Sequence, residues 1–183
     1  MVDALHFTGN AEADALIGRD PLALLIGFVL DQQVTVPTAF AGPLKLQQRL
    51  GGLDAGAIAA TDPQALEEAF RAKPAIHRFP GNMAKRVQEL CAVVAEEYGG
   101  DAARVWGDAA DTADLKRRLE ALPGFGEMKV KALASVLAKR FGLEIAAPLV
   151  PDHAMLGDVD SPEALAEYQA AKRAYKASLR AGE

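Results

Sequence analysis

The sequence has very little of the residues that build disulfides and metal sites. It contains one cysteine, Cys91, and three histidines among 183 residues. A single cysteine cannot form an internal disulfide, and this set supplies neither the four cysteines of an iron–sulfur cluster nor the ligand spacing of a zinc site. Apolar neighbours at helical spacing predict that Cys91 is buried as a small hydrophobic residue. We therefore expect no iron–sulfur cluster and no other resident metal.

Long hydrophobic runs and alternating runs are also missing. No segment has the roughly 20 apolar residues that span a bilayer, and residues 1–10 do not resemble a signal peptide. We expect a cytoplasmic protein, associated with the nucleoid in a prokaryote, and no membrane partner. Half of the residues are apolar, alanine is abundant and only 6% are aromatic. With no stretch that alternates as a strand, this composition predicts an all-α fold.

Helix signals divide the chain into ten segments. The Asp-Pro or Ser-Pro pairs at 20–21, 62–63 and 161–162 provide an N-cap followed by a first-turn proline. The glycines at 51–52, 99–100 and 142 are typical helix ends. The expected helices lie near residues 11–18, 21–32, 38–50, 54–60, 63–72, 82–98, 102–106, 112–121, 127–141 and 162–179.

The net charge of −5 is unfavourable for binding a polyanion, but the charge is unevenly distributed. Residues 1–70 hold three basic and nine acidic side chains, whereas residues 71–140 hold thirteen basic and nine acidic. Residues 141–183 are acidic again, with four basic and seven acidic side chains. This pattern is consistent with a local nucleic-acid footprint in the middle of the chain, although solvated helix faces would give a similar count.

The most informative motif is Leu122-Pro123-Gly124-Phe125-Gly126, which lies between two segments with helical periodicity. Pro123 and Gly124 end the first helix, and Gly126 allows a tight turn into the second. Such a hairpin exposes backbone N–H groups at the start of a helix. These groups can bind a phosphate without reading a base.

This pentapeptide resembles the hairpin of the helix-hairpin-helix (HhH-GPD) superfamily of base-excision DNA glycosylases, which includes endonuclease III-like and AlkA-like enzymes. Three further segments follow the family's order. Residues 21–33 are similar to an early buried helix that ends in a glutamine-bearing turn, and residues 79–90 to a turn with a lysine and the helix that leads to the hairpin. The third is the acidic loop around Asp152. The match is closest to small members without an iron–sulfur cluster.

The resemblance implies a fold of two helical lobes with the active-site cleft between them. One lobe, about residues 31–138, would be a bundle that contains the hairpin. The other would combine residues 1–30 with residues 139–183. Relatives bind a monovalent cation through backbone carbonyls of the hairpin, and the resemblance allows the same ion here.

The implied reaction is the hydrolysis of the N-glycosidic bond of a damaged base that is flipped out of double-stranded DNA. A carboxylate stabilises the oxocarbenium character of the transition state. In the family, this aspartate lies about twenty residues beyond the second hairpin glycine, where this chain has Ala146. A modest insertion would bring Asp152 to that place, and Asp158 is the second candidate. A third reading is that neither residue is catalytic and that each is a turn or cap carboxylate.

Bifunctional relatives carry a lysine nucleophile two residues after the second glycine, where this chain has Met128. Lys129 is one residue later, about 100° around the helix, so we expect its side chain to point elsewhere. This predicts a glycosylase without lyase activity. Lys129 and Lys131 are then phosphate contacts or exposed helix charges.

The expected DNA-binding residues come from the same segments, with the protein acting as a monomer. They are Gln32, Gln33, Arg78, Lys85, Gly124, Gly126, Lys129 and Lys131. Two alternatives remain open at this point. One is a non-catalytic helix-hairpin-helix DNA-binding protein that lacks the acid, and the other is a helical interaction protein in which the pentapeptide is incidental. The damaged base cannot be named from the sequence.

Overall fold

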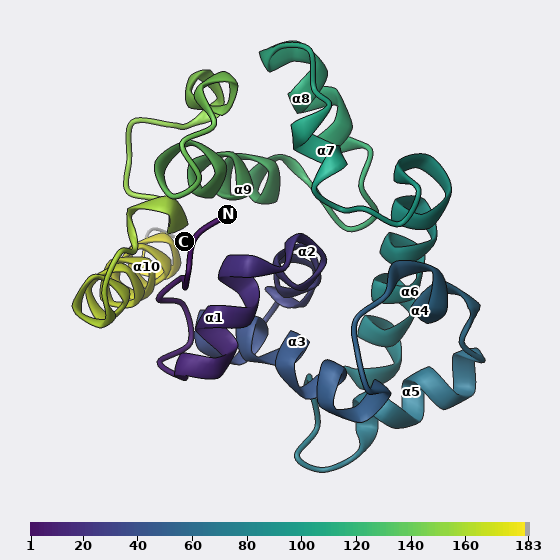
Figure 1. The fold of residues 1–183 in the computed structure, drawn as a ribbon. Coiled ribbons are helices and arrows are strands. Elements are labelled where there is room, and N and C mark those ends of the chain that lie inside the picture. Colours follow the sequence, from purple (N-terminus) through teal and green to yellow (C-terminus); the bar gives the residue numbers. More distant parts are fainter. Residues whose placement is uncertain (182–183) are drawn as a thin grey trace.

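The structure, a computed structural model, describes residues 1–181 and contains helices and no strands over that range (Figure 1). None of the described helices is both long and apolar enough to cross a membrane. The elements, in chain order, are α1 (Ala11–Arg19), α2 (Pro21–Leu30), α3 (Val36–Leu50), α4 (Ala55–Ala60), α5 (Pro63–Arg71), α6 (Pro80–Tyr98), α7 (Arg104–Gly107), α8 (Thr112–Glu120), α9 (Glu127–Lys139), the 3₁₀ turns η1 (Glu144–Leu149) and η2 (Leu156–Asp158), and α10 (Pro162–Ala181).

The expected all-α fold is confirmed, and each expected helix is present with its ends within about two residues of the predicted ones. The Asp20 carboxylate accepts the N–H of Leu22 at 2.8 Å, and Asp62 and Ser161 cap their helices in the same way. Gly51 and Gly99 end α3 and α6 with φ of +79° and +63°, the left-handed conformation that glycine adopts at little cost. The turns η1 and η2 were not predicted, because one turn of 3₁₀ helix leaves no periodic pattern.

Helix α2 is the centre of the fold. Every residue from Leu22 to Leu30 is buried, and α1, α3 and α6 pack around this helix. The ring of Phe28 meets the ring of Phe40 from α3 edge-on at 5.1 Å. A helix that is apolar on all sides is stable only when other elements cover all of its faces, and α2 is covered in this way.

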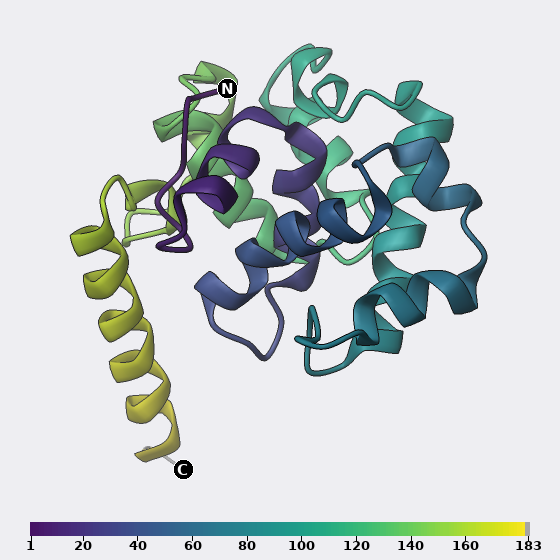
Figure 2. The same ribbon diagram turned by 60° about the horizontal axis from the view of Figure 1, so that its bottom comes forward.

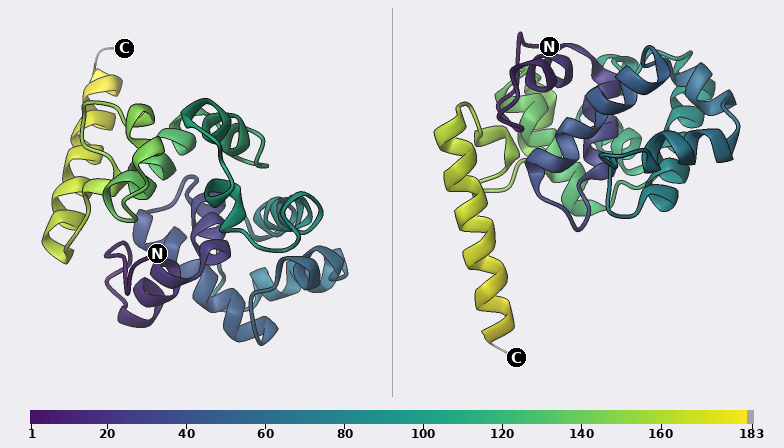
Figure 3. Two further views of the ribbon diagram at one scale, coloured as in Figure 1. Left: turned by 45° about the horizontal axis from the view of Figure 1, so that its top comes forward. Right: turned by 90° about the horizontal axis from the view of Figure 1, so that it is seen from below.

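Helix α9 connects the hairpin to the C-terminal part of the chain. Both 3₁₀ turns pack on α9, and η2 is attached by the N–H of Gly157, which donates to the hydroxyl of Ser135 at 2.9 Å. The first half of α10 covers the core through Leu165, and the rest of this helix extends away from the body (Figures 2 and 3). The division into lobes 31–138 and 1–30 plus 139–183 stays a prediction.

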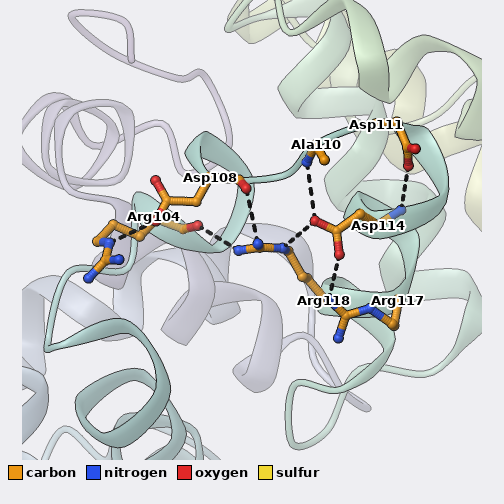
Figure 4. A network of polar contacts seen from close by, with 7 residues as sticks. All are labelled: Arg104, Asp108, Ala110, Asp111, Asp114, Arg117 and Arg118. Atoms are coloured by element: carbon orange, nitrogen blue, oxygen red, sulfur yellow. Dashed lines mark hydrogen bonds and ion pairs between the residues drawn. The ribbon is translucent and has the colours of Figure 1, made fainter.

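A polar network braces α8, the first helix of the hairpin (Figure 4). The Asp114 carboxylate accepts the N–H of Ala110 at 3.1 Å and the Nε–H of Arg118 at 2.8 Å, and it pairs with Arg117. Arg118 also donates to the carbonyl of Asp108 at 3.0 Å. The Ala110 N–H and the two guanidinium groups hold the pKa of Asp114 at about 2. The α7–α8 connection is therefore tied together by charge as well as by packing.

Candidate functional site

The hairpin leaves the start of α9 uncapped. Gly124 turns the chain with φ of +83°, and the N–H of Phe125 donates to the carbonyl of Leu122 at 3.1 Å. Gly126 is the N-cap of α9 in extended conformation and has no side chain to bond the first-turn N–H groups. These N–H groups carry the positive end of the helix dipole. The hairpin thus has the backbone geometry of an anion site, as its sequence predicts.

The hairpin rests on the C-terminal end of α2 (Figure 1). Phe125 is buried with its ring 6.1 Å from that of Phe28. The ammonium of Lys129 donates to the carbonyl of Val29 at 3.2 Å, so one turn of α9 is bonded to the last turn of α2. Residues about 100 positions apart in the chain therefore form one surface.

A pocket of about 330 Å³ opens at this junction. Its polar side chains include Gln32, whose Oε1 accepts from the guanidinium of Arg86 on α6. The lining residues are Gln32, Arg86, Gly124, Gly126, Glu127, Met128 and Lys129. A larger and more open hollow of about 650 Å³ lies at the N-terminus, but none of its lining residues comes from the hairpin.

His77 connects the end of α2 with the segment before α6 through hydrogen bonds to the backbone. Its Nε2 lies 3.2 Å from the carbonyl oxygen of Leu30 and 3.0 Å from that of Gln32, and its Nδ1 accepts the N–H of Phe79 at 3.1 Å. Since Nδ1 accepts, the ring proton belongs on Nε2 and the imidazole is neutral. Burial lowers the pKa of His77, and the charges of Arg78 and Lys129 add to this effect.

Lys129 requires a correction to the expectation from the sequence. Its side chain was expected to point elsewhere than that of Met128, and it does reach Val29 while Met128 is exposed, yet both residues still line the same pocket. The reason is that the pocket surrounds the first turn of α9, and the long lysine side chain reaches back to Val29. Burial lowers the pKa of Lys129 and the charge of Asp31 raises it, while Arg86 acts in the same direction as burial.

The other predicted DNA-binding side chains lie around the pocket without forming one cluster. Gln33 is exposed with φ of +57°, and Arg78 is exposed with its guanidinium 4.9 Å from the ring centre of Phe79. Lys85 is exposed and lies 4.0 Å from Glu89. Lys131 donates to Glu127 at 2.6 Å. Their roles in binding stay predictions.

Ion pairing distinguishes the basic residues near the pocket from the others. Among the thirteen basic side chains of residues 71–140, nine have a carboxylate oxygen within 4.0 Å in the described part of the chain. The four without such a partner are Lys73, Arg78, Arg86 and Lys129. Arg86 and Lys129 are lining residues, and Arg78 adjoins His77 in the chain. Two of the four unpaired basic residues of this segment therefore line the pocket at the hairpin.

The two predicted catalytic aspartates lie after α9, in different settings. Asp152 is exposed in the loop between η1 and η2 and has no hydrogen bond to any described residue. Asp158 accepts the Nζ–H of Lys139 at 2.5 Å and the N–H of Met155 at 2.8 Å. Burial opposes the charge of Asp158, but Lys139 and the Met155 N–H outweigh it and lower the pKa. Neither residue lines the pocket, and their catalytic roles stay predictions.

The sequence reasoning missed two residues at this site. His77 is a lone histidine two positions before Phe79, and nothing in its local pattern signals a contact with residues 45 positions away. Asp31 directly precedes Gln32 and Gln33, which were predicted to bind DNA. Its place in the run Asp-Gln-Gln was therefore the available signal that it lies near the same site.

Comparison with known families agrees with this geometry. Residues 26–180 match the model of the HhH-GPD superfamily base excision DNA repair proteins. The chain belongs to this superfamily. Comparisons with curated proteins and with solved structures give no match. The resemblance read from the hairpin is thereby confirmed, and the superfamily implies a base-excision DNA repair function of the glycosylase type.

Over residues 1–181, no group of three or more His, Cys, Asp or Glu side chains is arranged to hold a metal ion. The expectations about cofactors, including a monovalent cation at the hairpin, stay predictions. Cys91 is buried on α6, and burial raises the pKa of its thiol to about 12, so this thiol is inert at neutral pH.

Proposed function

We propose that this HhH-GPD protein is a monofunctional DNA glycosylase that acts as a monomer on double-stranded DNA. It flips a damaged base out of the duplex and hydrolyses the N-glycosidic bond. The observation that carries the proposal is the pocket at the hairpin, where the uncapped N–H groups of α9 meet the side chains of Gln32, Arg86 and Lys129. Membership of the superfamily supplies the reaction class.

The proposed DNA interface uses two kinds of contact. The first-turn N–H groups of α9 bind a phosphate, and the free charges of Arg78, Arg86 and Lys129 bind the backbone on both sides of it. Phe79 is exposed for 40% of its surface, and its N–H donates to Nδ1 of His77. An exposed aromatic ring at the edge of a basic pocket can stack on bases next to the flipped nucleotide.

The absence of lyase activity is proposed from the same pocket. The lysine of bifunctional relatives is replaced by Met128, and the Lys129 amine donates to the carbonyl of Val29. A nucleophilic amine must be neutral and free to attack a sugar carbon. Burial lowers the pKa of Lys129, which favours its neutral amine. If the chain has a lyase activity, Lys129 is therefore the residue expected to form the covalent adduct.

The alternative function is non-catalytic DNA binding by the hairpin. It is favoured by the settings of the two predicted acids, since Asp152 is exposed without a hydrogen-bonding partner among the described residues and Asp158 is held by Lys139. A protein without a suitable carboxylate would bind lesions and leave them intact.

A cleavage panel tests the proposal. Purified protein is incubated with duplexes that each carry one alkylated, deaminated or oxidised base, and the strands are analysed with and without hot alkali. We expect breaks only after alkali, on a subset of the lesions. Breaks without alkali, together with a borohydride-trapped adduct that Lys129→Gln loses and Lys116→Gln keeps, would show a lyase. Salt-sensitive binding without product on any lesion would favour the alternative.

A further inference from the structure

Hydrogen bonds fix the backbone on both sides of Asp31. The N–H of Gln32 donates to the carbonyl of Leu30 at 2.7 Å, and Asp31 between them has φ of −72° and ψ of 68°. These angles and this hydrogen bond define an inverse γ-turn with Asp31 at its apex. The ring of His77 bonds the carbonyls of Leu30 and Gln32, one on each side of Asp31.

The neighbours of Asp31 in the chain are the residues that build the pocket. Two positions before it, the carbonyl of Val29 receives the ammonium of Lys129. One position after it, Gln32 lines the pocket and accepts from Arg86. Asp31 is not itself a lining residue, but in the chain it lies between the two points at which α9 and α6 are bonded to the end of α2.

The Asp31 carboxylate differs from the other two candidates, because Asp158 is bonded to a lysine and Asp152 is exposed. Asp31 is half-buried and has no hydrogen bond or ion pair to any described residue. Burial lowers the pKa of Lys129, and the charge of Asp31 raises it. The same charge also raises the pKa of Tyr168. For Tyr168 the larger cause is burial of the phenol. An unpaired, half-buried carboxylate whose charge acts on a lysine that lines a pocket is suited to electrostatic catalysis.

We propose that Asp31 is the catalytic carboxylate of this protein. The inference rests on the proposed glycosylase function. As the bond between C1′ and the base nitrogen breaks, its electron pair leaves with the base, and the Asp31 carboxylate stabilises the positive charge that develops on the sugar. Water then adds its oxygen to C1′. Asp31 takes the proton of this water and returns it to the departing base or to solvent, so the products are the free base and an abasic site.

The role of His77 follows from this assignment. It contacts the backbone on both sides of Asp31 and does not reach the reacting atoms, so it is a positioning residue. Lys129 contributes positive charge toward the DNA phosphates. The amide of Gln32 is left for the flipped base or for the base that it leaves unpaired.

Three isosteric variants test the assignment on a lesion duplex that the wild-type protein cleaves. In single-turnover assays we expect Asp31→Asn to lower the rate of base release by about 100-fold or more. Asp152→Asn and Asp158→Asn should stay within about threefold, unless loss of the Lys139 pair unfolds η2. Affinity of Asp31→Asn for the duplex should be unchanged or higher, because the substitution removes a negative charge near phosphates.

A second variant separates chemistry from structure. Asp31→Ala should be as slow as Asp31→Asn, and added formate should restore part of its rate, which a purely structural role would not allow. A rate of Asp31→Asn within threefold of wild type, or a loss that parallels lost DNA binding, would overturn the assignment and leave the glycosylase function standing. If the wild-type protein releases no base from any lesion, the proposed function fails and the assignment fails with it.

Discussion

His77 connects two segments of the chain with one neutral ring. The proton on Nε2 serves the carbonyls of Leu30 and Gln32, and the lone pair on Nδ1 receives the N–H of Phe79. Protonation of Nδ1 would remove this acceptor and place a charge among Arg78 and Lys129. The ring is therefore suited to a structural role only while it is neutral, and this gives the site a defined pH dependence.

The substitution His77→Gln tests this role. The unfolded histidine has a pKa near 6.5 and the folded one a lower value, so the unfolded chain takes up the proton first as the pH falls. The stabilisation from neutral His77 is complete above pH 6.5 and is lost as the pH falls toward the folded pKa. Urea midpoints at pH 7.5 and pH 5.5 should show a larger acid loss for wild type than for His77→Gln.

At pH 7.5, the variant should cost about 1–3 kcal/mol of unfolding free energy, because the amide cannot serve all three backbone groups. His153→Gln is the matched control, since His153 is exposed in the loop after η1. It should keep the wild-type pH dependence. Equal acid sensitivity of His77→Gln and wild type would show that another group titrates.

Individual residues were the least predictable part of the site. Gln32 and the hairpin glycines follow from the sequence, because an apolar helix ending in amides and a Leu-Pro-Gly-x-Gly turn are local patterns. The direction of Lys129 does not, since it depends on a carbonyl 100 positions earlier. Asp31 acquires its setting from His77, and that contact exists only in the folded chain.

At the scale of elements, η2 is attached to α9 through one close approach of two backbones. A Cβ atom on Gly157 would lie 2.2 Å from the carbonyl oxygen of Ser135, which cannot move without breaking α9. Glycine is required here for space, because its φ is not in the left-handed region. The Ser135 hydroxyl completes the attachment by accepting the N–H of Gly157 and donating to the carbonyl of Ala132 at 2.7 Å.

Gly157→Ala should therefore destabilise the protein by about 1–3 kcal/mol or more, as expected for overpacking against a rigid wall. Gly52→Ala is the matched control, because nothing lies within 4 Å of its added Cβ and its φ is unrestricted. Thermal unfolding of the two variants beside wild type measures the difference. Similar melting temperatures for both variants would contradict the close packing of η2 on α9.

The helices themselves were largely predictable, for reasons that are local. Caps, first-turn prolines and terminal glycines fix helix boundaries within a few residues of the chain. The 3₁₀ turns escaped prediction because tertiary contacts of Gly157 and Ser135, and not a periodic pattern, hold η2 in place. The pocket arises from contacts between α2, α6 and α9, which no single segment encodes.

At the scale of the whole molecule, the protein is acidic overall and yet has a small region of free positive charge. Nine of the thirteen basic residues in the middle of the chain are paired, and two of the four unpaired ones, Arg86 and Lys129, line the pocket at the hairpin. A footprint of this size neutralises few phosphates, so binding should weaken with salt less steeply than for a broadly basic protein. The acidic remainder limits contact to the surface around the pocket.

The central claim is that this surface binds damaged DNA and removes a base. The most direct measurement is mass spectrometry of the free base released from lesion-bearing duplexes by the wild-type protein. We expect a free damaged base together with an unbroken strand that carries an abasic site. Unchanged duplex across alkylated, deaminated and oxidised lesions, despite salt-sensitive binding, would contradict this claim and identify a non-catalytic helix-hairpin-helix DNA-binding protein.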